Sequence, residues 1–269
     1  NHLAILWRDI QGIGFESIST PLAWMGAFGY SAQLFFDFQG YSLMAIGIGE
    51  MLGFDLPKNF DHPYRSRTVS EFYRRWHITL GRWFRDYLYI PLGGNRKGNA
   101  WTFFNLLIVW VVTGMWHGST INFPLWGLIL FVFIALERFV IRNFLEKHGW
   151  LAHLYIWFVI PLTWVVFAIT KLSDLKVYFA RLFPFFGTGI AVNAGDYLKY
   201  GRTYGVFFLL AFVVSLPFMD KDSSEPVKQL LLKKCWKKWW MKAILFVVLW
   251  ICIYQIANGL NNPFMYFSF

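Results

Sequence analysis

Charged residues and cysteines are scarce in this sequence, and several motifs of soluble enzymes are missing from it. Charged residues make up only 15% of the 269 positions. The two cysteines, Cys235 and Cys252, form neither a disulfide framework nor a set spaced like zinc ligands, so we predict no metal site. There is no G-x-S-x-G, P-loop or H-E-x-x-H motif, and no histidine is followed five residues later by aspartate. These absences exclude the common signatures of hydrolases, nucleotide-binding loops, zinc proteases and glycerolipid acyltransferases.

Hydrophobic and aromatic residues dominate what is present. The sequence is 57% hydrophobic and 22% aromatic, with a mean hydropathy of +0.43. A soluble domain cannot bury this much apolar surface, so the composition predicts an all-α, polytopic protein of the lipid bilayer. The 15 Trp and 13 Tyr suit the interfacial belts of such a protein. The net charge of +10 is then better explained by basic cytoplasmic loops than by nucleic-acid binding.

Six apolar segments are predicted to span or enter the membrane: 21–54, 101–116, 124–139, 150–170, 204–218 and 241–257. Several are shorter than the ~20 residues that a perpendicular span needs, so tilted, broken or re-entrant helices are expected. Lys and Arg number nine in 55–100, three in 137–149 and seven in 219–242, against none in 117–123 and five in 171–203. The positive-inside rule therefore predicts that the first three connections are cytoplasmic, and that the last two and the C-terminus lie outside.

The segment 68–89 predicts one basic amphipathic helix at the cytoplasmic interface. Thr68 and Glu71 fit the S/T-x-x-E pattern of a capping box, which starts helices. Helical spacing places an apolar stripe on one face: Phe72, Trp76, Leu80, Trp83 and Tyr87. It places a second, mostly basic set on another face: Arg74, His77, Gly81 and Arg85. From periodicity alone, the better interpretation of this helix is a membrane-surface anchor.

His117 ends an apolar run, within the sequence TGMWHGST at 113–120. An ionisable ring at membrane depth is costly, which favours a functional role. Thr113 lies four residues earlier, so on one helix its hydroxyl group could orient the imidazole. Neutral imidazole can take a proton from a hydroxyl group near physiological pH. The alternative, a histidine bonded to a neighbouring helix, is equally compatible with these features.

His77 shares its predicted face with Arg74 and Arg85, which would lower its pKa and keep the ring neutral. From the residues alone, a histidine that merely lines a basic surface is the better interpretation.

Asp37 lies inside a long apolar run. With Tyr30, Gln33 and Tyr41 it forms a polar ridge at i, i+3, i+7 and i+11 of a helix. We interpret this ridge as a buried polar network that fixes helix packing, and prefer that role to direct catalysis by Asp37.

Four long and specific stretches carry a resemblance: FFDFQGYS at 35–42, RRWHITLGRWFRDYLYIPLGGNR at 74–96, TGMWHGSTINFPLWG at 113–127, and the ending NPFMYFSF. They resemble the membrane-bound O-acyltransferase family, and most closely its branch of bacterial alginate O-acetyltransferase membrane subunits. YIPLGGNR favours this branch over members that load D-alanine onto teichoic acids. The resemblance implies a single domain over 1–269 with helices around a central tunnel, and we expect the family's N-terminal helices to be missing from this sequence.

The resemblance also implies roles for the two histidines. His117 occupies the position of the family's essential catalytic residue, and His77 that of its second polar site residue. Acetyl transfer to an alcohol needs a base and oxyanion donors, which we assign to His117 and to Ser119 and Thr120. Four arginines are predicted to hold a phosphate-bearing thioester such as acetyl-CoA, with anionic-lipid contact as an equal alternative: Arg74, Arg75, Arg82 and Arg85.

The predicted function is a membrane O-acyltransferase that passes acetyl from a cytoplasmic donor across the bilayer for polysaccharide O-acetylation, with no bound cofactor. An extracytoplasmic acetyltransferase is the expected partner, and the bacterial cytoplasmic (inner) membrane is the expected location. The alternatives are D-alanyl or other acyl transfer to a cell-wall polymer, and a non-enzymatic transporter or lipid-flipping protein. Loop charges would place His77 and His117 at opposite faces of the membrane, whereas the family's tunnel brings them together. We expect one shared tunnel.

Overall fold

The computed structural model describes residues 2–186, 194–215 and 238–258, and all regular structure within them is helical. This confirms the predicted all-α class. The α-helices are α1 (His2–Ile13), α2 (Thr20–Met51), α3 (Val69–Arg75), α4 (Ile78–Phe84), α5 (Asn99–His117), α6 (Asn122–Leu136), α7 (Arg142–Lys147), α8 (Gly149–Ala168), α9 (Leu172–Leu182), α10 (Asp196–Ser215) and α12 (Trp239–Ala257). Two π-helical turns, Arg85–Tyr89 and Glu137–Ile141, follow α4 and α6.

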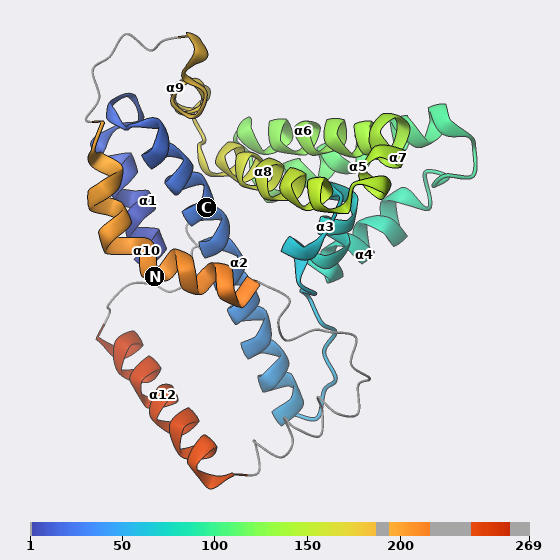
Figure 1. The fold of residues 1–269 in the computed structure, drawn as a ribbon. Helices are drawn as coiled ribbons and strands as arrows, with labels where there is room; N and C mark the ends of the chain where they lie inside the picture. Colours follow the sequence, from blue (N-terminus) through green and yellow to red (C-terminus); the bar gives the residue numbers. More distant parts are fainter. Residues whose placement is uncertain (1, 187–193, 216–237, 259–269) are drawn as a thin grey trace.

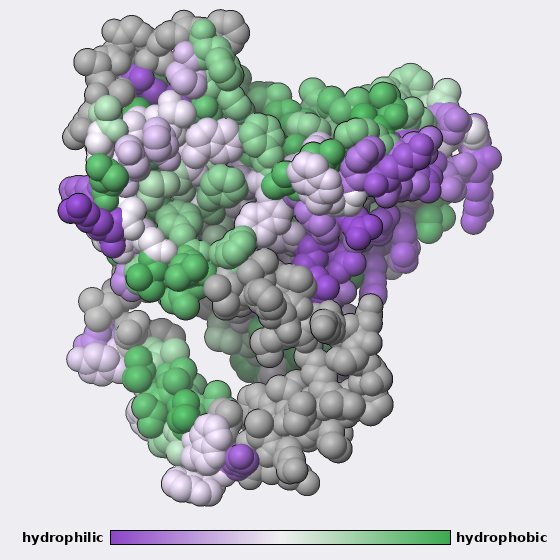
Figure 2. All heavy atoms as spheres, in the orientation of Figure 1, coloured by the Kyte–Doolittle hydropathy of each residue, from purple (hydrophilic) through white to green (hydrophobic). Residues whose placement is uncertain are grey.

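Apart from α12, the helices form two packed groups that meet where α2 contacts α8 (Figure 1). In one group α5, α6 and α8 lie side by side, and α3 packs beneath α6 and α8. In the other, α1 and α10 pack on α2. Figure 2 shows hydrophilic side chains gathered over the region of α3, α4 and α7, with apolar side chains over α6. The charged groups therefore collect at one end of the α5–α6–α8 group.

Three of the described helical segments are long and apolar enough to cross a membrane: Asn99–His117, Asn122–Lys147 and Gly149–Ala168. They match the predicted segments 101–116, 124–139 and 150–170 to within a few residues, except that the second continues through Lys147. The first segment, predicted as 21–54, is one continuous helix of 32 residues. The prediction 204–218 lies partly outside the described residues, while 241–257 falls within α12. Two amphipathic helices, α1 and α9, were not predicted.

The start of the predicted helix 68–89 is confirmed in detail. The Thr68 hydroxyl oxygen accepts from the Glu71 N–H at 3.0 Å. Glu71 reaches back to the N–H of Arg67 at 2.9 Å, one residue before the cap. The first bond satisfies a donor that the first helical turn would otherwise leave without a partner, and the second satisfies a donor just before the helix.

The continuation of that helix was predicted wrongly, because α3 ends at Arg75. Trp76 is extended and His77 adopts the left-handed conformation, with φ 48° and ψ 55°, before α4 begins. The extended turn directs Trp76 into an aromatic core, edge-on to Phe60 at 5.0 Å and against Trp164 at 5.0 Å. The apolar stripe is consequently split: Trp76 is buried, whereas Trp83, beyond the break, is 52% exposed.

Candidate active site

A cavity of about 920 Å³ lies between α3 and α4 on one side and α5, α6 and α8 on the other. It is lined by both His77 and His117. Each imidazole contacts the same indole, that of Trp116, with ring centroids 6.4 Å away for His77 and 4.9 Å away for His117. The structure thus brings together the two histidines that loop charges had placed at opposite faces.

His117 is the last residue of α5 and stands in an aromatic cage. Its ring is edge-on to Trp126 at 5.1 Å and to Phe167 at 5.2 Å. α6 approaches α5 closely at Gly127, where a Cβ would clash with the Trp110 carbonyl oxygen. The cage depends on this close approach. Thr113 lines the same cavity, but its hydroxyl group donates to the Val109 carbonyl at 2.7 Å. The Thr113 proton is therefore not the one that orients His117.

His77 stands at the break between α3 and α4. Its ring is edge-on to Phe38 at 4.8 Å, and its Nδ1 lies 3.2 Å from Oδ1 of Asn59. Burial lowers the pKa of His77 to about 4, because a desolvated imidazole resists charging. The predicted neutral ring is confirmed, but the predicted cause was wrong: burial, and not charge from Arg74 and Arg85, produces the shift.

Arginines surround the charged end of this cavity. The lining includes three of the four predicted ones, Arg74, Arg82 and Arg85. It also includes three that were not predicted: Arg67, Arg138 and Arg142. The arginines suit the anionic part of an acyl donor, and the histidines lie where its reactive group would enter the cavity.

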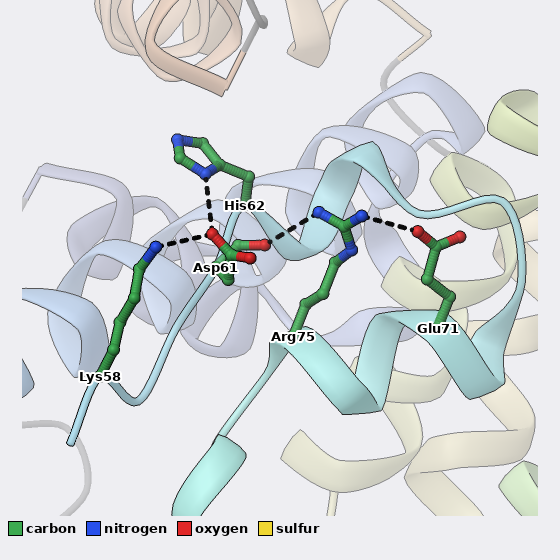
Figure 3. Close-up of polar contacts among 5 residues, drawn as sticks. All are labelled: Lys58, Asp61, His62, Glu71 and Arg75. Carbon is green, nitrogen blue, oxygen red and sulfur yellow. Dashed lines mark hydrogen bonds and ion pairs between the residues drawn. The ribbon is translucent and has the colours of Figure 1, made fainter. Parts of the chain in front are cut away.

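Arg75 does not line this cavity. Its guanidinium pairs with Glu71 at 2.9 Å and donates to the Asp61 carbonyl at 3.4 Å, and Asp61 in turn pairs with Lys58 at 2.7 Å (Figure 3). Arg75 therefore ties α3 to the connection that precedes it.

Ser119 and Thr120, the predicted oxyanion donors, are exposed and are not among the residues that line the cavity. The Thr120 hydroxyl group donates to Oδ1 of Asn122 at 2.5 Å. Asn122, which is fully buried, donates to the Phe167 carbonyl at 2.9 Å. This chain of bonds fastens the α5–α6 connection to the end of α8.

The predicted polar ridge on α2 divides between two environments. Asp37 and Tyr41 line a second cavity of about 410 Å³, which also includes His77. Gln33 lies outside both cavities, is 7% exposed, and its Oε1 has no hydrogen-bond partner among the described residues. His77 thus lines both cavities, whereas the arginines line only the first and Asp37 lines only the second.

Glu137 and Asn59 are site residues that sequence reasoning missed. Glu137 is 3% exposed and lines the large cavity. Its carboxyl oxygens accept from the N–H of Val69, and from the N–H and hydroxyl of Ser70 at 3.1 Å each, so it caps α3 from another helix. A single acid at the end of an apolar run was the available signal for Glu137. Nothing comparable marked Asn59, which lies in a polar connection.

Comparison with known proteins identifies the family of this chain. The model of the membrane-bound O-acyltransferase family (MBOAT) matches residues 14–173, which hold both histidines and every arginine of the cavity. The chain belongs to this family.

Its relatives act on different polymers, as their names state. "Probable alginate O-acetylase AlgI" of Pseudomonas putida is 32% identical over 265 residues, covering 94% of this chain and 55% of that protein. "Peptidoglycan O-acetyltransferase" of Helicobacter pylori is 42% identical over 172 residues, covering 61% and 33%. "Teichoic acid D-alanyltransferase" of Bacillus subtilis is 30% identical over 150 residues, covering 53% and 37%. The chain therefore spans about half the length, or less, of these relatives.

Proposed function

We propose that this chain carries the acyl-transfer site of a membrane O-acyltransferase, and that the site acetylates hydroxyl groups of an extracellular or cell-wall polysaccharide. One observation carries the proposal: a single cavity joins six arginines at one end to His77 and His117 inside the helical group. The names of the alginate and peptidoglycan relatives support acetyl as the group transferred.

His117 is the general base in this proposal. As the acceptor oxygen forms its bond to the acetyl carbonyl carbon, His117 takes the hydroxyl proton. The tetrahedral intermediate then collapses, the carbon–sulfur bond breaks, and the departing thiolate takes that proton from His117. A positioned base of this kind contributes roughly 10²–10⁴-fold to such a step. In this proposal the aromatic rings around His117 keep water from the thioester and so limit its wasteful hydrolysis.

The donor in this proposal is a cytoplasmic thioester such as acetyl-CoA, held by its phosphates at the arginine-lined end. The second cavity, with Asp37 and Tyr41, is then the approach for the acceptor or for an extracytoplasmic acetyltransferase that receives the acetyl group. Arg74 and Arg75 give a matched test of the donor site. Arg74→Ala should raise KM for acetyl-CoA, whereas Arg75→Ala should lower thermal stability and leave KM unchanged, because only Arg74 lines the cavity.

The acyl group and the acceptor polymer are tested together in cells. In a strain that lacks the native gene, the wild-type protein should restore polymer-bound acetate and His117→Ala should not, at equal amounts of membrane protein. Restoration of ester-linked D-alanine without acetate would instead support the function named for the teichoic acid relative. Restoration of acetate by His117→Ala would support a transporter that leaves the chemistry to another protein.

A further inference from the structure

Asn59, in the connection between α2 and α3, binds the start of α4 at several points. Its backbone carbonyl accepts from the Ile78 N–H at 2.9 Å. Its side-chain Oδ1 accepts from the N–H of Thr79 at 3.2 Å and from the Thr79 hydroxyl group at 3.0 Å. The same oxygen lies 3.2 Å from Nδ1 of His77. Asn59 is therefore a hydrogen-bond acceptor around which the strained turn at His77 is built.

These contacts settle which way the Asn59 amide points. A backbone N–H can only donate, so the atom that faces the Thr79 N–H must be the amide oxygen and not the NH₂ group. The NH₂ group then faces the hydroxyl oxygen of Ser42, 3.2 Å away, which can accept from it. Every partner of the amide is satisfied in this orientation.

The orientation of the amide in turn fixes the proton on His77. A carbonyl oxygen can only accept, so the Nδ1 atom that faces it must carry the hydrogen. The Thr79 hydroxyl group does not compete for Nδ1, because it is 3.5 Å from that nitrogen and 3.0 Å from the Asn59 oxygen. In a neutral ring with a hydrogen on Nδ1, the lone pair is on Nε2.

Nε2 is the side of the ring left for a bound molecule. Among the described residues, the polar contacts of the His77 ring, the hydrogen bond to Asn59 and the longer approach of the Thr79 hydroxyl group, are both at Nδ1. The edge-on contact with Phe38 holds the plane of the ring, and His77 lines both cavities. A lone pair placed there accepts a hydrogen bond from an O–H or N–H group.

We propose that Asn59 is a positioning residue that holds His77 as the Nδ1–H tautomer, so that Nε2 accepts a hydrogen bond from the substrate hydroxyl or amide at the junction of the two cavities. The proposal rests on the proposed acyl transfer for its substrate, but the tautomer itself is a property of the protein alone. Without Asn59 the ring is free to carry its hydrogen on Nε2. That N–H group would then face the O–H or N–H donor of the substrate and could not accept from it.

The test is ¹⁵N NMR of the purified protein labelled in histidine, at pH 8 and without substrate, with the His77 signals identified by their loss in His77→Gln. We expect a pyrrole-type Nδ1 and a pyridine-type Nε2. In Asn59→Ala the pattern should reverse or average, and acyl transfer should fall roughly 10–100-fold, the loss typical when the partner that orients a metal-bound histidine is removed. Asn59→Asp, which keeps an acceptor oxygen, should retain the wild-type pattern.

Asn105→Ala is the matched control. Like Asn59, Asn105 bridges a connection to a helix, donating to the Tyr89 and Gly94 carbonyls, but it is buried and lines neither cavity. It should lower thermal stability without changing the His77 tautomer. A pyridine-type Nδ1 in the wild-type protein, or an unchanged pattern in folded Asn59→Ala, would overturn the proposal. If the NMR patterns are as expected but the protein transfers no acyl group, the role of Asn59 in fixing the tautomer stands and the proposed function is refuted instead.

Discussion

Glu137 is the position at which the structure makes its clearest energetic prediction. It gives the buried first turn of α3 its acceptors: Val69 is fully buried, and its N–H has the Glu137 carboxyl group as its partner. Ser70 adds an N–H and a hydroxyl group at 3.1 Å. A buried N–H left without an acceptor costs about 1–3 kcal/mol, and the Ser70 groups, only half-buried, can recover part of their loss from water. We therefore expect Glu137→Ala to lower the free energy of unfolding by about 2–4 kcal/mol.

The assay for Glu137→Ala is thermal unfolding of the purified protein in detergent, with Glu146→Ala as the control. Glu146 also lines the cavity, but its pair with Arg142 is exposed, so its loss should cost only about 0–1 kcal/mol. Glu137→Gln, which keeps one carboxamide oxygen, should fall between the two. Equal stabilities for Glu137→Ala and Glu146→Ala would refute the idea that a residue of another helix caps α3.

Three further predictions concern packing, pH and access. Gly127→Ala should lower the free energy of unfolding by about 1–3 kcal/mol, because its Cβ would clash with the Trp110 carbonyl, whereas Gly205→Ala, with open space around it, should be neutral or stabilising in the same thermal assay. Because burial lowers the pKa of His77 to about 4 in the folded state, its contribution to the free energy of unfolding should be complete above pH ~6.5 and lost as pH falls from there toward 4. The free energy of unfolding, measured against pH, should therefore fall less steeply toward acid in His77→Gln than in the wild type. Identical slopes would contradict this. Gly81→Leu should abolish acyl transfer without loss of thermal stability, because Gly81 lines the cavity and its Cβ would meet only the Tyr73 carbonyl, at an ordinary 3.6 Å; full activity would show that the donor does not pass Gly81.

Hydropathy and capping patterns predicted the parts of the fold that depend on local sequence. The three segments long and apolar enough to span a membrane were found because each is a long apolar run, and the start of α3 was found because Thr68 and Glu71 bond to nearby backbone groups. The break at His77 was missed because its cause is not local. The Asn59 carboxamide, 18 residues away, accepts hydrogen bonds from His77 and from the Thr79 N–H at the break. Trp76 turns into a core formed by other segments.

The same limit applies to the site. Helical periodicity put Arg74 and Arg85 on the side of His77, and all three line the large cavity. Arg75 was not part of this periodic face but was grouped with the donor-binding arginines, and its guanidinium is instead held by Glu71 and by the carbonyl of Asp61 in another segment.

Nearness to His117 in sequence likewise did not identify all the residues of its cavity. Ser119 and Thr120 were predicted at the site on proximity alone, yet the α5–α6 connection carries them away from the cavity. The actual walls around His117 come from Trp126 and Phe167, on α6 and α8. A pattern within one helix does not specify which residues of the next helix will face it.

The central claim is that His117, in the cavity it shares with His77, is the base for acyl transfer from a thioester. The most direct measurement is the release of thiol from acetyl-CoA by the purified protein, with and without a polysaccharide acceptor, for the wild type and His117→Ala. The account predicts acceptor-dependent release that falls by ~10²–10⁴-fold in His117→Ala while the variant unfolds at the wild-type temperature. Release at the wild-type rate by a folded His117→Ala protein would contradict it.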